Sequence, residues 1–243
     1  MSGSFIGFTP DAMQFLVDLA FNNDRAWFQP RKAEYERLLR QPLEALCTDL
    51  AVELGKRGVP LRADPKSSPF RIYRDTRFSK DKSPYKTNVA ASFPWLGEGV
   101  ATSDGQSERH GGGYFHLSPE GSYMGGGMWH PEPARLAAFR RVVDESTEVA
   151  LGALEDPVYL ARFMPVHGDS LKRVPQGYAP DHPHADLLKL KDVTFGHHLS
   201  DADAASPELP DLLVEIYAAS VPVLSLLAKL APGETRAGWL RGA

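Results

Sequence analysis

The sequence is almost without cysteine, since Cys47 is the single one in 243 residues. One thiol cannot form an internal disulfide, so a disulfide-stabilised secreted fold is excluded, and the composition fits a reducing compartment. The N-terminus also lacks a basic segment followed by an apolar run, and no stretch approaches the apolar length that spans a bilayer. We therefore expect a soluble, cytoplasmic protein without a membrane partner.

Common catalytic motifs are lacking as well. The absence of a Walker-type phosphate loop, of GxGxxG and of GxSxG argues against the usual nucleotide hydrolases, dehydrogenases and α/β-hydrolases. The eight histidines show no HExxH spacing, and His197 and His198 would point to opposite faces of a strand. His182 and His184 flank a proline and would share an ion only in a special geometry. We predict no metal site, and the sequence identifies no cofactor and no reaction.

Positive charge is scarce overall but concentrated in one place. The chain carries 27 Lys and Arg against 31 Asp and Glu, a net charge of −4, which argues against a protein that coats nucleic acid. In residues 69–86, however, six cations stand against two carboxylates, a local surplus of four: Arg71, Arg74, Arg77, Lys80, Lys82 and Lys86 against Asp75 and Asp81. This contrast predicts a preference for negatively charged partners at one patch.

Helical signals fill the first 60 residues. Thr9 followed by Pro10 predicts a helix start, and residues 22–24 are expected to end that helix and cap the next. We expect a restart at Pro30 and a stop at Pro42, because proline disrupts a helix interior. A third helix then follows, with Cys47 as a small buried thiol and these inward residues: Leu43, Leu46, Leu50 and Leu54.

The middle of the chain alternates as strands do. Residues 70–73 and 87–93 have a period of two, and residues 114–118 and 122–129 form a predicted hairpin around a Pro-Glu-Gly turn. Residues 97–111 are rich in glycine and serine, and we expect a mobile loop there.

Three consecutive glycines, 125–127, interrupt the second strand of the hairpin. Glycine in a strand interior costs stability unless its missing side chain lets something approach closely. A ligand, a packed aromatic such as Trp129 or Tyr114, and a simple bulge all stay open as explanations.

The C-terminal half returns to helical patterns. One helix is expected to carry three solvated arginines: Arg135, Arg140 and Arg141. Residues 200–206 are expected to form a loop, and residues 210–230 a last, long helix. The whole pattern predicts a single α+β domain over residues 1–243, with a largely antiparallel central sheet flanked by N- and C-terminal helices.

The cationic stretch is the leading candidate site, because arginine forks match phosphate and carboxylate oxygens and lysine adds point charge. We expect it to bind, or to act on, a phosphorylated or otherwise anionic small molecule in a pocket. The predicted ligand-binding residues are Arg71, Arg74, Arg77, Lys80, Lys86 and Ser79. The predicted catalytic residues are His116, whose imidazole titrates near neutral pH, and Tyr85, which supplies a hydroxyl.

Two other interpretations stay open. In one, Arg74 and Arg77 pair internally with the two carboxylates of the stretch, and the lysines are solvated loop charges. In the other, Tyr73, Phe78 and Tyr85 lie between the cations and stack bases beside a neutralised backbone, so that the protein is an interaction module for nucleic acid or an acidic protein surface. A pocket around the arginines favours the small molecule, whereas an exposed basic ridge favours the interaction module.

Several strings of unusual composition resemble one family over most of the chain, from about Phe8 to the last helix. They are Asn22-Asn23 with Trp27-Phe28, FRIYRDTRFSKDKSPYK from Phe70, GGYFHLSPEGS from Gly112, GGGMW from Gly125, and Asp181-His182-Pro183. The chain is similar in them to a family of bacterial and fungal proteins, domain-of-unknown-function family 2461. The resemblance implies no particular activity, cofactor or catalytic residue.

Overall fold

The computed structural model describes residues 4–77, 79–96 and 111–230. Contacts within the chain divide it into two compact units that alternate along the sequence. Unit 1 comprises Met1–Phe93, Tyr114–Met124 and His197–Glu215, and unit 2 comprises Pro94–Gly113, Gly125–Gly196 and Ile216–Ala243. That the whole chain folds as one domain stays a prediction. The loop expected at residues 97–111 lies, except for Gly111, outside the described residues.

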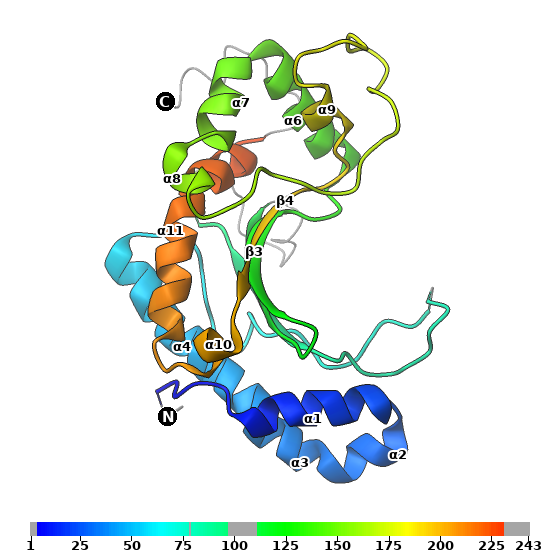
Figure 1. Cartoon of the computed structure of the whole chain (residues 1–243), viewed down its shortest axis with the longest axis vertical. Helices are drawn as coiled ribbons and strands as arrows, with labels where there is room; N and C mark the ends of the chain where they lie inside the picture. The colour runs from blue at the N-terminus through cyan, green and yellow to red at the C-terminus, as the bar shows by residue number, and fades with distance from the viewer. Residues whose placement is uncertain (1–3, 78, 97–110, 231–243) are drawn as a thin grey trace. The chain divides into compact units, whose positions relative to one another are not determined.

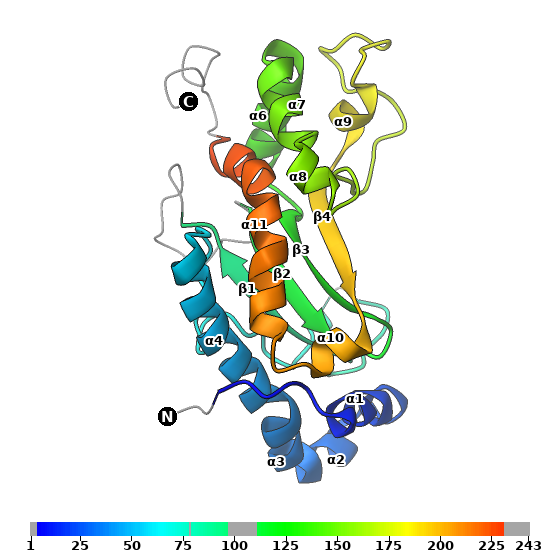
Figure 2. The same ribbon diagram turned by 60° about the vertical axis from the view of Figure 1, so that its left-hand side comes forward.

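The strands form one four-stranded antiparallel sheet in the order β1-β2-β3-β4 (Figure 2). Gly121, with φ +126°, donates its N–H to the Ser118 carbonyl at 3.1 Å and closes the predicted hairpin turn between β2 and β3. Helices precede and follow these strands in the chain, so the predicted α+β class with flanking helices is confirmed. The strands are β1 (Val89–Pro94), β2 (Gly112–Leu117), β3 (Ser122–Met128) and β4 (Val193–Leu199).

Unit 1 begins with a helical region that starts at the predicted caps (Figure 1). The Thr9 hydroxyl accepts the N–H of Ala12 at 3.4 Å, and the Asp24 carboxylate accepts the N–H of Trp27 at 2.9 Å. These side chains satisfy backbone donors that have no partner inside the helix. The elements are α1 (Pro10–Phe21), α2 (Arg25–Phe28), η1 (Gln29–Arg31), α3 (Lys32–Tyr35), η2 (Glu36–Arg40) and α4 (Gln41–Arg57).

The prediction that Pro42 ends the second helix is wrong. After α3 the chain forms a π-helical turn, η2, and continues without a break into α4. The N–H of Gln41 bonds to the carbonyl of Glu36, five residues back. This wider turn relieves the clash between a proline ring and the preceding carbonyl that an ordinary α-turn would produce.

The core of unit 1 contains the predicted inward residues of α4 together with Tyr85, which was predicted to lie in the candidate site instead. Phe28 stacks on Tyr85 with ring centroids 4.1 Å apart. Cys47 is fully buried, and burial raises the pKa of its thiol to about 12, so the thiol stays protonated as a packing residue. The predicted inward leucines of α4 are all buried: Leu43, Leu46, Leu50 and Leu54.

The N-terminal residues Phe5–Phe8, which we call the strap, are hydrogen-bonded to two helices of unit 1. The N–H of Phe5 donates to the Asp49 carboxylate of α4 at 2.8 Å, and the N–H of Phe8 donates to the Ala204 carbonyl at 3.0 Å. Between them Gly7 has φ +94°, and a Cβ there would lie 1.9 Å from the Ala205 carbonyl oxygen. Glycine is therefore required where the strap crosses this helix.

The helix that Ala204 and Ala205 belong to, α10 (Asp201–Ala205), lies where a loop was predicted, and that prediction is wrong. The Ser200 hydroxyl accepts the N–H of Asp203 at 3.1 Å, and the Asp203 carboxylate accepts the N–H of Ser200 at 2.9 Å. This reciprocal capping box holds the helix although the segment has little apolar periodicity.

In unit 2, α6 packs against both α7 and α9 (Figure 1). The prediction that Arg135 is solvated is wrong, because it is 8% exposed. Its Nη2 donates to the carbonyls of Leu227 and Ala228, at 2.9 and 3.0 Å, which end α11 and lack partners within that helix. The helices of this part are α6 (Pro133–Glu145), α7 (Thr147–Leu154), α8 (Pro157–Leu160) and α9 (Ala185–Lys189), together with α11 (Leu209–Ala228) from Ile216 onward.

Two of the three consecutive glycines in β3 are explained by close packing inside unit 2. A Cβ at Gly126 would lie 2.4 Å from the Gly112 carbonyl oxygen and 2.8 Å from Cζ of Phe195. Gly127 has φ +113°, and its Cβ would lie 2.2 Å from the Val193 carbonyl oxygen. Neighbouring backbone and a packed aromatic therefore account for both glycines.

By length and composition alone, α11 is a helix that could cross a membrane, and among the described residues it is the one that passes this test. The prediction that no stretch approaches the length that spans a bilayer is therefore wrong for this helix. More than half of the helix is buried within the protein. Such burial is typical of a core helix, so the length of α11 is weak evidence for a membrane.

Candidate functional site

Backbone pairing fixes both ends of the cationic segment, residues 69–86, which the structure describes except at residue 78. Two antiparallel bridges hold it: Pro69 with Ala91, and Tyr73 with Tyr85. Three N–H···O bonds accompany them: Phe70 to Ala90 at 2.8 Å, Lys86 to Ile72 at 2.8 Å and Arg74 to Pro84 at 2.9 Å. The predicted strand at 70–73 is therefore present as isolated bridges rather than as a regular strand.

One side chain of the helical region locks the C-terminal end of this segment. Asn23 donates its Nδ2–H to the Tyr85 carbonyl and accepts the Tyr85 N–H on Oδ1, both at 3.0 Å. The amide thus satisfies both backbone groups of a fully buried residue, as a neighbouring strand would. The backbone at the C-terminal end of the cationic segment is therefore held in place at Tyr85.

Two of the arginines are paired within the segment. Arg74 forms an ion pair with Asp81, and Arg77 binds Asp75 with Nη2–Oδ2 and Nε–Oδ1 distances of 2.6 and 3.0 Å. The hydrogen bonds from Arg77 hold the pKa of Asp75 well below its usual range, and those from Ser83, with a further one from Arg74, lower the pKa of Asp81. This pairing is the internal network that the sequence left open as an alternative.

The remaining cations keep the surface positive. Two carboxylates neutralise at most two of six cations, so the surplus of four persists after pairing. Arg71 and Lys80 are exposed, and within the described part of the chain neither forms an ion pair. Lys82 donates to the Thr76 carbonyl at 2.8 Å, and Lys86 Nζ lies 4.8 Å from the ring centroid of Phe70.

The predicted hydroxyl donors lie in unlike environments. Ser79 is half-buried within the segment. Tyr85 is fully buried under Phe28, and its hydroxyl has no hydrogen-bond partner among the described residues. In this arrangement Tyr85 is a core residue that fixes the segment, and its hydroxyl is out of reach of a ligand on the surface.

His116, the predicted proton-transfer residue, has both ring nitrogens engaged. Nε2 lies 3.0 Å from the Gly121 carbonyl and therefore carries the proton, while Nδ1 lies 3.2 Å from the Tyr114 hydroxyl and accepts from it. Burial lowers the pKa of His116, and the neighbouring His198 lowers it further against the opposing effect of Gly121. The ring is thus held neutral near pH 7.

His116 belongs to a continuous row of rings on one face of the sheet in unit 1. We call this set the aromatic row: Phe70, Tyr114, His116, Tyr123 and His198. Successive ring centroids are 6.2, 5.5, 5.6 and 5.6 Å apart. Alternate residues of a strand share a face, and the intervening Phe115 and Leu117 are fully buried on the other face. Through Lys86 and Phe70 the row adjoins the cationic segment.

His116 was predicted from the sequence, but the row around it was not. Tyr123 and His198 come from strands whose register is not readable from local patterns. The one available signal was the alternation of Tyr114 and His116 with buried residues along β2.

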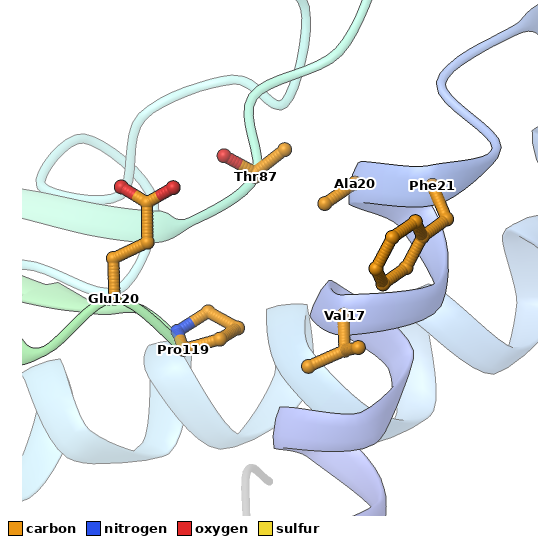
Figure 3. Close-up of a pocket in the computed structure, with 6 residues that line it drawn as sticks. All are labelled: Val17, Ala20, Phe21, Thr87, Pro119 and Glu120. Carbon is orange, nitrogen blue, oxygen red and sulfur yellow. The ribbon is translucent and has the colours of Figure 1, made fainter.

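A small pocket lies elsewhere in unit 1. Its volume is about 170 Å³, and none of the segment's cations lines it. Figure 3 shows side chains of α1 on one wall facing Pro119 and Glu120 of the hairpin turn and Thr87 on the other. Phe21 at its rim is 85% exposed. Within the described ranges, no three histidine, cysteine or acidic side chains gather as metal ligands.

Comparison with curated proteins and with solved structures gives no match. A family model described as "Conserved hypothetical protein (DUF2461)" matches residues 11–225. That range contains both units' described helices from α1 to most of α11, together with the cationic segment and the aromatic row. The chain therefore belongs to the DUF2461 family.

Proposed function

We propose that the protein binds an anionic, phosphate-bearing ligand through the cationic segment of unit 1. The observation that carries this proposal is the surplus of four positive charges on a segment whose two ends are fixed by bridges and by Asn23. Fixed ends restrict the segment before the ligand arrives, so binding costs less conformational entropy than it would on a free loop.

The exposure of the cations favours an extended ligand over a small one. The Arg77 side chain is 77% exposed, and Arg71 and Lys80 are also exposed. An ion pair at such a surface contributes about 0–1 kcal/mol, whereas millimolar affinity already requires about 4 kcal/mol. One phosphate on this surface would bind very weakly. A polyanion that engages several cations at once gains from each contact and from released counterions.

The internal ion pairs are compatible with this proposal. Asp75 and Asp81 hold Arg77 and Arg74 in defined positions, and an exposed pair exchanges partners at little cost. A polyanion therefore competes with two weak internal contacts rather than with buried ones.

The test is titration of the protein with inorganic polyphosphate of defined length, followed by calorimetry at two salt concentrations. The double variant Arg71→Gln/Lys80→Gln is expected to bind about tenfold more weakly, and each lost contact should reduce the salt slope by about one. The control is Arg25→Gln/Lys32→Gln, which removes the same charge from exposed positions on helices of the same unit. Equal losses in both variants, or no binding by the unaltered protein, would contradict the proposal.

A further inference from the structure

The aromatic row is an unusual surface for a protein to leave accessible. Its five rings come from four separate stretches of the chain and are half-buried or exposed. The opposite face of the same strands carries Phe115, Leu117 and Met124, which are fully buried. The core of unit 1 is thus built on one face, and the row occupies the other.

The aromatic row and the cationic segment lie next to each other at Phe70. This ring lies 6.2 Å from Tyr114 in the row and 4.8 Å from Nζ of Lys86 in the cationic segment. The row itself contains no carboxylate, and its two histidines contribute further ring faces rather than acidic groups. A ligand that carries both flat apolar groups and negative charges would be complementary to the two surfaces together.

We propose that unit 1 binds single-stranded nucleic acid, with unpaired bases stacked on the aromatic row and phosphates on the cationic segment. Every base has a flat π-face, and stacking on aromatic side chains of a sheet beside a basic groove is a general mode of single-strand binding. This proposal rests on the anion binding proposed above and names the class of the ligand.

Other macromolecules fit the two surfaces less well. An extended peptide adds to the edge of a sheet through its backbone, whereas the row lies on a face. Duplex nucleic acid presents phosphates to the cations but keeps its bases stacked internally, so the rings would gain nothing. An acidic peptide would likewise use only the cations.

Fluorescence anisotropy with a labelled oligo(dT) 12-mer tests the proposal on the full chain. Four unlabelled competitors separate the contributions: oligo(dT) 12-mer itself, an abasic oligomer with the same number of phosphates, duplex DNA of the same length, and a poly-glutamate 12-mer. We expect oligo(dT) to compete at least tenfold better than each of the others, since only it offers stacking bases.

Variants of the row separate the rings from the charges. Tyr114→Leu/Tyr123→Leu keeps apolar side chains but removes two π-faces, and should weaken oligo(dT) binding at least tenfold while leaving the abasic oligomer unaffected. Tyr114→Phe/Tyr123→Phe retains the rings and should bind within about threefold of the unaltered protein. Phe21→Leu, an exposed aromatic of α1 outside the row, is the matched control and should change nothing. Thermal unfolding of each variant shows that the fold is retained.

The outcomes distinguish the two proposals. If oligo(dT) and the abasic oligomer bind equally well, base stacking is refuted and anion binding stands. If neither binds and polyphosphate also fails, both proposals are refuted. If poly-glutamate competes as well as oligo(dT), the surface recognises acidic proteins and the nucleic-acid proposal is overturned. If the Leu and Phe double variants lose binding equally, the rings do not act through their faces and the proposal is likewise overturned.

Discussion

Replacement of Asn23 by alanine is expected to destabilise unit 1, because it removes the two hydrogen bonds between the Asn23 side chain and the backbone of Tyr85. Asn23 forms two hydrogen bonds of 3.0 Å with the backbone of Tyr85, 62 residues away. Tyr85 is fully buried, and among the described residues its N–H and C=O bond to no other backbone group. Alanine at position 23 therefore strands a buried donor and a buried acceptor at once.

The size of the effect follows from these two groups. A buried polar group that loses its partner costs about 1–3 kcal/mol. Asn23 itself is only half-buried, so water partly replaces the amide and the lower part of this range applies. The free energy of unfolding is expected to fall by about 2–4 kcal/mol. Asn23→Asp should cost a similar amount, because a carboxylate still accepts the Tyr85 N–H but cannot donate to the carbonyl.

Urea titration followed by circular dichroism measures this loss, and hydrogen exchange at the Tyr85 amide reports on the bond directly. Asn22→Ala is the matched control, since the neighbouring Asn22 is exposed and, within the described part of the chain, its side chain bonds only to the Asp18 carbonyl near the helix end. It should cost less than about 1 kcal/mol. Equal stability of Asn23→Ala and the unaltered protein, or unchanged exchange at Tyr85, would refute the reasoning.

Three further perturbations test other parts of the structure. Gly126→Ala places a Cβ 2.4 Å from a backbone oxygen and should cost about 1–3 kcal/mol in urea titration, whereas Gly152→Ala, with open space within α7, should stabilise by about 0.5–1 kcal/mol. Burial lowers the pKa of His116 below 6.5, so the unfolded chain binds the proton first as pH falls. The free energy of unfolding should therefore decrease as the pH falls below about 6.5, and this decrease should be smaller in His116→Gln. Urea titrations of both proteins above and below pH 6.5 measure the difference. Arg77→Gln removes an exposed ion pair with Asp75, so the melting temperature should stay nearly unchanged; a large drop in the melting temperature would instead indicate that Arg77 belongs to a buried pair.

Local signals predicted the fold wherever the cause of an element lies within a few residues of it. Thr9 and Asp24 cap the helices that follow them, and the turn at Gly121 closes the hairpin as expected. The miss at Pro42 has a different origin, because a π-helical turn depends on how the preceding backbone is wound. The capping box at Ser200 was readable in the sequence and was overlooked.

Contacts between residues far apart in the chain were the part that the sequence could not supply. Arg135 is 92 residues from the Leu227 carbonyl that it caps, so nothing in its own helix marks it as buried. In the candidate site, the short-range partners of Arg74 and Arg77 were foreseen as one alternative. The aromatic row was not, because the proximity of Tyr123 to His198 depends on the pairing of strands 75 residues apart.

The strap at the N-terminus sets limits on how the protein can be handled and varied. A label or fusion partner attached ahead of Ser4 leaves the anchoring of Phe5 and Phe8 intact. A fusion that replaces Phe5 and Phe8 removes the hydrogen bonds that connect the strap to α4 and α10. At Gly7 even a single methyl group would clash with the Ala205 carbonyl and displace the strap from α10.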